Sequence, residues 1–234
     1  MSGAGSKWAG GRAPLCRDAA VLPFDVDEFF AVFAVYNAAV WPAQWLLYGI
    51  AVAALLLTTS QWRLRHRTIS ALLAFLWIWM ALAYHLFAFA RINPAAYLFA
   101  AAFLIEAGVL LWSGLKARSL EYSIHQDGAG YAALAMLLYA LVVYPALNRM
   151  TEHMYPSAPT FGVPCPTTIF TLGLLTLARG SGRAVALAIP LLWSMVGGSA
   201  AFLLDVPQDL GLVGAGMLTF ALALRELRGK ESRG

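Results

Sequence analysis

The residues that could carry chemistry are a cysteine, a histidine and a glutamate set within long apolar runs. Cys165 stands in the segment PTFGVPCPTTIF, residues 159–170, where three prolines and a glycine lead into a short apolar stretch. A thiol and an imidazole are ligands that soft metals prefer, and such a pair can also serve nucleophilic catalysis, so Cys165 and His85 are candidate metal ligands. A carboxylate inside an apolar run is costly and by default indicates a proton or ion path, which makes Glu106 a candidate ion-binding residue.

The composition places these residues in a membrane. Of 234 residues, 61% are hydrophobic and 12% are charged, whereas a soluble domain carries about 25% charged residues. Apolar runs near the ~20 residues that span a bilayer occur at 39–57, 69–90, 95–114, 130–147, 184–203 and 207–224, with a shorter run at 166–179. The sequence therefore predicts an all-α polytopic membrane helical bundle of about seven transmembrane helices, whose fifth helix is short and preceded by a re-entrant segment.

The basic residues indicate the orientation of the bundle. With seven spans, one side of the membrane receives 11 of the 16 lysines and arginines: Arg63, Arg65, Arg67, Lys116, Arg118, Arg179, Arg183, Arg225, Arg228, Lys230 and Arg233. Loops rich in Lys and Arg stay in the cytoplasm. We therefore expect a cytoplasmic C-terminus and an N-terminus outside.

The chain is expected to form one transmembrane domain, residues 24–225, between two short tails. Residues 1–23 are rich in Gly, Ala and Ser, which is typical of a flexible tail, and residues 226–234 form a short basic cytoplasmic tail. Asp25 and Glu28 match a capping box, and aromatic residues follow at helical spacing. These features predict an interfacial helix at about 25–37.

Depth within the membrane was estimated from the rise of about 1.5 Å per helical residue. The run from Pro166 to Arg179 is too short to span, so its N-terminus is expected about 9 Å below the outer face, reached by non-helical chain. Pro166 would occupy the first helical position, and Thr167 and Thr168 would help to cap the first turn. The exposed N–H groups and the helix dipole would form a site for an anion or polar solute.

The same estimate places other polar residues at defined levels. His85 and Gln44 come to the depth of Cys165, so the three could line one pocket, with Asn37, Trp41, Tyr84, Asn93, Tyr144, Asp205 and Asp209 nearer its mouth. Glu106 falls near the midplane with Tyr139 and Ser194. The candidate substrate- or ion-binding residues are therefore Gln44, His85, Glu106, Cys165, Thr167 and Thr168.

Each candidate also has a structural explanation. Cys165 could be an inert packing residue or form a disulfide with Cys16, and Glu106 could be a neutral packing residue. The glycines between 197 and 216 are more typical of close helix packing than of a hinge. No Walker A, GxGxxG, HExxH, CxxC or CxxCH motif occurs, and no lysine lies within a span, which excludes a retinal Schiff base. The sequence names no cofactor.

Four segments carry a resemblance to a known family. They are YNAAVWPAQ (36–44), INPAAYLF (92–99), PTFGVPCPTTIF (159–170) and GGSAAFLLDVPQDLGL (197–212). Together they resemble a family of bacterial multipass membrane proteins catalogued as a domain of unknown function. The resemblance implies a bacterial cytoplasmic (inner) membrane location and brings no activity or functional residue with it.

The leading functional hypothesis is a transporter or channel for an ion or small solute, with an outward-facing polar pocket and Glu106 as a midplane site. Its partners would be the lipid bilayer and the solute, with no nucleic acid, and it could form a homo-oligomer. The alternatives are a membrane-embedded enzyme or metal/redox protein that uses Cys165 and His85, and an accessory subunit of a membrane complex.

Overall fold

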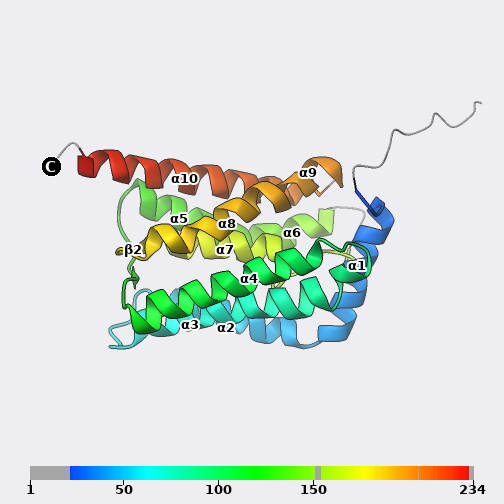
Figure 1. Ribbon diagram of the computed structural model, residues 1–234, viewed down its shortest axis with the longest axis horizontal. Coiled ribbons are helices and arrows are strands. Elements are labelled where there is room, and N and C mark those ends of the chain that lie inside the picture. The colour runs from blue at the N-terminus through cyan, green and yellow to red at the C-terminus, as the bar shows by residue number, and fades with distance from the viewer. Residues whose placement is uncertain (1–21, 151–153, 205, 232–234) are drawn as a thin grey trace, which may run out of the picture.

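The computed structural model describes residues 22–150, 154–204 and 206–231, and it is a bundle of helices with nearly parallel axes (Figure 1). Two ends can be distinguished. The α1 end carries α1 (Val26–Val40) and α9 (Ala200–Leu203), and the strand end carries β2 (Ala178–Arg179) and the C-terminal end of α10 (Leu210–Glu231). The side chains that the sequence indicated as one pocket lie toward the α1 end.

Helix α1 crosses the α1 end of the bundle and leads into α2 (Ala43–Leu57) through a bend of 88°. The capping box is confirmed: the Asp25 side chain accepts from the Glu28 amide, and the Glu28 side chain accepts from the Asp25 amide. One face of α1, including Phe29 and Phe33, is buried. The helix expected at about 25–37 is α1, which continues to Val40, and the apolar run 39–57 forms α2, which begins at Ala43 rather than at residue 39.

Five helical segments of the described chain are long and apolar enough to cross a membrane, or six if α1 and α2 form one broken span. Each long segment changes helical type along its length, from α to π or 3₁₀ geometry. They comprise α3 (Arg65–Trp79) with η1 (Met80–Leu86) and η2 (Phe89–Arg91); α4 (Ala96–Leu111) with η3 (Trp112–Lys116); α5 (Gly128–Leu138) with η4 (Tyr139–Val143), α6 (Tyr144–Leu147) and η5 (Asn148–Met150); α8 (Arg183–Val196) with η6 (Gly197–Ser199) and α9; and η7 (Pro207–Asp209) with α10. These limits agree closely with five of the predicted apolar runs.

Helix α7 (Pro164–Leu177) is the short helix that the sequence predicted, and it lies in the middle of the bundle. It packs against α5, α8 and α10, and Cys165 is its only residue that is not fully buried. The expected position of Pro166 at the start of the helix was wrong, because the helix begins two residues earlier, at Pro164. Pro164 fits the first helical position for the same reason, since that position needs no N–H partner.

The strand end contains a small β ladder that the all-α prediction did not include. Strand β1 (Glu121–Tyr122) pairs antiparallel with β2, and Glu121 lies opposite Arg179. Opposite charges facing each other across a ladder are favourable. The ladder fastens the end of α7 to the loop that follows η3.

Close packing explains several of the glycines between 197 and 216. A Cβ on Gly216 would meet the Ser194 hydroxyl at 2.0 Å, and one on Gly198 would meet Val213 at 2.5 Å. Small residues let neighbouring helices approach closely. The packing interpretation of these glycines is thus confirmed at the contact between η6, α8 and α10.

Candidate ligand-binding cavity

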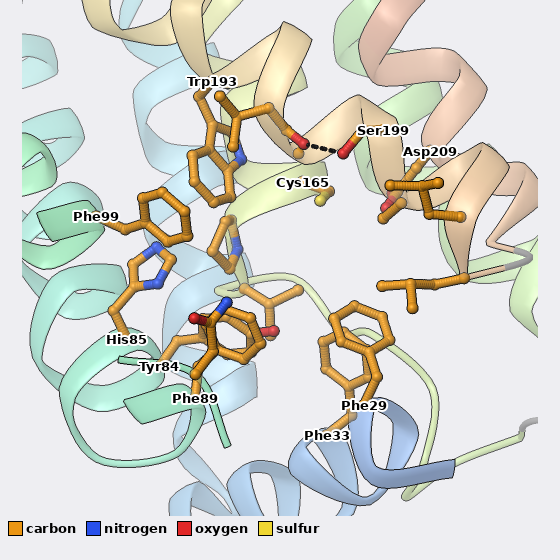
Figure 2. A pocket seen from close by; sticks show the side chains of 18 of the residues that line it. Phe29, Phe33, Tyr84, His85, Phe89, Phe99, Cys165, Trp193, Ser199 and Asp209 are labelled. Atoms are coloured by element: carbon orange, nitrogen blue, oxygen red, sulfur yellow. Dashed lines mark hydrogen bonds between the residues drawn. The ribbon is translucent and has the colours of Figure 1, made fainter. Parts of the chain in front are cut away.

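A cavity of about 130 Å³ lies near the α1 end of the bundle (Figure 2). A cavity of about 150 Å³ accepts a molecule of the size of benzene, so this one has room for a single small ligand. Its walls come from α1, η1, η2, α4, α6, α7, α8, η6, α9 and η7 and from the segments before α1 and α7. The lining residues are Leu22, Phe24, Phe29, Phe33, Tyr84, His85, Phe89, Asn93, Phe99, Tyr144, Val163, Pro164, Cys165, Trp193, Val196, Gly197, Ser199, Ala200, Leu203, Leu204 and Asp209.

Breaks in regular helix surround the cavity. Tyr84 and His85 lie on η1, a π-helical segment, and Gly197 and Ser199 lie on the 3₁₀ segment η6. π-Helical turns are rare and occur frequently at functional sites. The cavity thus lies where two spans depart from α-helical geometry.

His85 forms one wall of the cavity and has no hydrogen-bond partner in the described part of the chain. Its exposed fraction is 0%, and neither ring nitrogen has a partner among the described residues. The imidazole packs against aromatic rings, with centroid distances of 4.6 Å to Phe103, 5.3 Å to Trp193 and 5.7 Å to Phe99. A buried polar atom without a partner costs about 1–3 kcal/mol, so a ligand that donates a hydrogen bond to His85 would recover this energy.

A second polar group borders the cavity at Asp209, which is 2% exposed. The Tyr144 hydroxyl donates a hydrogen bond to the carboxylate Oδ1 at 2.6 Å. The Cys165 thiol lies within hydrogen-bonding reach of the same carboxylate, and Figure 2 shows the two side chains side by side. Cys165 is a free thiol, whereas Cys16 lies outside the described residues.

The N-terminus of α7 is not the bare anion site that the sequence suggested. Pro164 and Pro166 have no N–H, and the Thr167 amide is directed to the Val163 carbonyl at 3.4 Å. The Thr167 side chain does not cap the helix, because its hydroxyl accepts from the Gly162 amide in the preceding segment. With few free N–H groups and Asp209 nearby, this terminus does not favour an anion.

Gln44 lies away from the cavity, although its depth was expected to match. Its amide Nε2 donates to the Asn37 carbonyl, and the residue lines a separate hollow with Trp41 and Tyr155. Asn37 is fully buried and donates to the carbonyls of Pro156 and Ala158. These residues hold the segment that leads into α7, and they do not contact the cavity.

Glu106 and Thr168 are also outside the cavity. Glu106, on α4, is 0% exposed, and neither carboxylate oxygen has a hydrogen-bond partner among the described residues. Thr168 is buried on α7 with its hydroxyl unpaired. Of the six candidate residues, the structure brings together His85 and Cys165 on one cavity, and it places Gln44, Glu106, Thr167 and Thr168 elsewhere.

Of the residues that the sequence placed near the mouth, Tyr84, Asn93, Tyr144 and Asp209 do line the cavity, and Asp205 lies outside the described residues. The cavity also has walls that the sequence did not indicate, chiefly Trp193 and Phe99. The described residues contain no group of three or more His, Cys, Asp and Glu side chains placed to hold a metal ion. The geometry therefore resembles a small-molecule pocket, mostly apolar with a few convergent polar groups.

The fold and the cavity define a class: a helical protein with multiple candidate membrane spans and an internal pocket near one end. Residues 26–233 match DUF6064, a family of unknown function. The chain belongs to this family. No curated protein and no solved structure matches the chain.

Proposed function

We propose that this membrane protein binds a small organic solute in the aromatic cavity and moves it across the bilayer. The observation that carries the proposal is the cavity itself, which borders His85 with both ring nitrogens unpaired. Buried polar groups are nearly always hydrogen-bonded in native proteins. His85 is one of several exceptions among the described residues, and a solute that completes its hydrogen bonding would account for it.

Two features support movement of the solute rather than storage. The cavity is walled by η1 and η6, segments whose geometry departs from the α-helix, and interrupted helices line the binding sites of many transporters. The distribution of Lys and Arg favours a cytoplasmic strand end, so the cavity would open toward the outer side. Under this orientation the solute enters from outside, near α1.

Filling the cavity tests the binding step. Ala200 lines it and Ala201 does not, and both lie on α9. In a Cys16→Ser background Cys165 is the only thiol, so its rate of reaction with N-ethylmaleimide reports access to the cavity. We expect Ala200→Phe to slow this reaction by about tenfold or more, equivalent to about 1.4 kcal/mol, and Ala201→Phe to leave the rate unchanged. Equal rates in the two variants would show that Cys165 is not reached through the cavity.

Transport is tested in proteoliposomes by light scattering. Vesicles shrink in hypertonic choline chloride, glycerol or sodium acetate and swell again as the solute enters. We expect faster swelling with wild-type and Ala201→Phe protein than with Ala200→Phe protein for at least one of these solutes. Identical swelling of all three preparations with every solute would refute transport of these solutes through the cavity.

A further inference from the structure

We infer that the ligand of the aromatic cavity is a small organic cation. This inference rests on the proposed function, because it names the kind of solute that the same cavity would hold. Three independent properties of the lining lead to it: its charge, its aromatic faces and its unpaired acceptor.

The charge of the lining is one-sided. Among the described residues that line the cavity, Asp209 is the one acidic residue, and none is a lysine or an arginine. The groups that contact the carboxylate are the Tyr144 hydroxyl and the Cys165 thiol, which are neutral donors. A buried carboxylate is costly unless a positive charge accompanies it, and the lining supplies none. A cationic ligand would compensate it, whereas an anionic ligand would be repelled.

The aromatic faces have the same preference. Seven phenylalanine, tyrosine and tryptophan rings surround the cavity besides Tyr144: Phe24, Phe29, Phe33, Tyr84, Phe89, Phe99 and Trp193. The face of an aromatic ring is negative and attracts cations, best of all with tryptophan. Groups of such rings are used to bind organic ammonium ions. Phe99 and Trp193 are 5.2 Å apart in an edge-to-face arrangement, so the rings form a wall and not isolated contacts.

His85 supplies the hydrogen-bond acceptor. A neutral imidazole has one nitrogen that accepts and one that donates, and neither nitrogen of His85 has a partner among the described residues. An ammonium N–H could donate to the accepting nitrogen. In Figure 2, His85 and Phe99 stand on one side of the cavity and Asp209 and Ser199 on the other, so a ligand between them would meet both polar groups.

Three probes of the same shape and different charge test this inference. Benzylammonium, benzyl alcohol and benzoate each carry one ring, and each is used to protect Cys165 from N-ethylmaleimide in the Cys16→Ser protein. We expect benzylammonium to protect at concentrations about tenfold or more below those of benzoate, with benzyl alcohol between them. The Ala200→Phe variant, whose cavity is filled, should show no protection by any probe, which controls for effects of the probes on the lipid.

Asp209→Asn removes the charge and keeps an oxygen that can accept from Tyr144. We expect benzylammonium to lose its advantage over benzyl alcohol in this variant, while protection by benzyl alcohol persists and shows that the cavity is intact. If the variant does not fold, the comparison of the three probes on the parent protein still decides the ligand class. Benzoate protecting as well as benzylammonium would overturn the cation inference alone. Failure of all three probes would count against the cavity as a binding site, and with it the proposed function.

Discussion

His85 and Glu106 are two buried polar residues, and only His85 lies beside the aromatic cavity. Both side chains are fully buried, and both lack a hydrogen-bond partner among the described residues. His85 borders the aromatic cavity, whereas Glu106 does not line it. A ligand in this cavity could therefore complete the hydrogen bonding of His85 but would not reach Glu106. Under the proposed function, an unpaired buried group takes part in binding only where the cavity adjoins it.

The largest expected effect comes from the network that supports the cavity without lining it. Asn37→Ala removes the hydrogen bonds from Nδ2 to the carbonyls of Pro156 and Ala158 and the bond that the Thr160 hydroxyl donates to Oδ1. Each is worth about 1 kcal/mol, so the free energy of unfolding should fall by about 3 kcal/mol in denaturant titrations followed by circular dichroism. Thr160→Val removes one of these bonds and should cost about 1 kcal/mol.

The network matters to the cavity because the segment that it holds ends at Val163 and Pro164 in the cavity wall. We expect a folded Asn37→Ala protein to lose the protection of Cys165 by benzylammonium. If the Asn37→Ala protein loses about 3 kcal/mol of stability but benzylammonium still protects Cys165, the segment before α7 does not support the cavity. The contrast between the cavity and the region around Glu106 would then be weaker.

Glu106→Leu tests the region around Glu106, which we call the closed region because Glu106 does not line the cavity. Removing a buried carboxylate that has no partner should raise the free energy of unfolding by about 2 kcal/mol, because leucine has a similar size and no desolvation cost. Protection of Cys165 and swelling of proteoliposomes should be unchanged. If Glu106→Leu is more stable but transports no solute, the result would support the sequence-based hypothesis that Glu106 is a midplane ion site.

His85→Phe is the matching change at the cavity. Phenylalanine keeps the edge-to-face packing against Phe103 and Trp193 and removes the unpaired nitrogens, so we expect a gain of about 1 kcal/mol in unfolding free energy. Unlike Glu106→Leu, this change should weaken the protection of Cys165 by benzylammonium. If benzylammonium protects Cys165 equally well in both variants, His85 does not take part in binding.

Residue positions along the helix axes could be derived from the sequence, and their angles around each helix could not. The apolar runs and flanking charges gave most helix limits to within a few residues. Counting residues from helix ends also placed His85 level with Cys165, and both line the cavity. The same count placed Gln44 at that level, but Gln44 faces Asn37 and another hollow. Counting residues gives the position of a side chain along its helix. The direction in which the side chain points depends on the rotation of the helix and on its neighbours.

The contacts that assemble the remaining walls of the cavity had no local signal. The π-helical geometry of η1, which carries His85, has no mark in the residues MALAYHL. Trp193 reads as one of several tryptophans in apolar runs, and its meeting with Phe99 depends on packing between α8 and α4. Asp209 gains its significance only from contact with Tyr144, 65 positions earlier in the chain. Such contacts arise from the tertiary arrangement.

The smallest expected effect concerns Tyr122, which extends the closed region to the strand end. The Tyr122 and Ser70 hydroxyls are hydrogen-bonded at 3.0 Å, so Tyr122→Phe should lower the free energy of unfolding by about 1 kcal/mol at neutral pH. Burial raises the pKa of Tyr122, and this effect outweighs the hydrogen bond with Ser70, which lowers it; a negative charge on Glu106 would raise it further. The folded protein therefore holds this phenolic proton more tightly than the unfolded chain. The corresponding stability is present below the ordinary tyrosine pKa of about 10 and is lost as the pH rises above it.

Denaturant titrations between pH 8 and pH 11 measure this dependence. The decrease in stability above about pH 10 should be shallower in Tyr122→Phe than in the wild type, because one of the groups that must ionise is gone. Glu106→Leu should also make the decrease shallower, but less so, since burial is the larger cause of the Tyr122 shift. An alkaline decrease that is the same in wild type and Tyr122→Phe would show that Tyr122 is not buried at the strand end as described. The closed region around Glu106 would then not extend to Tyr122 at the strand end.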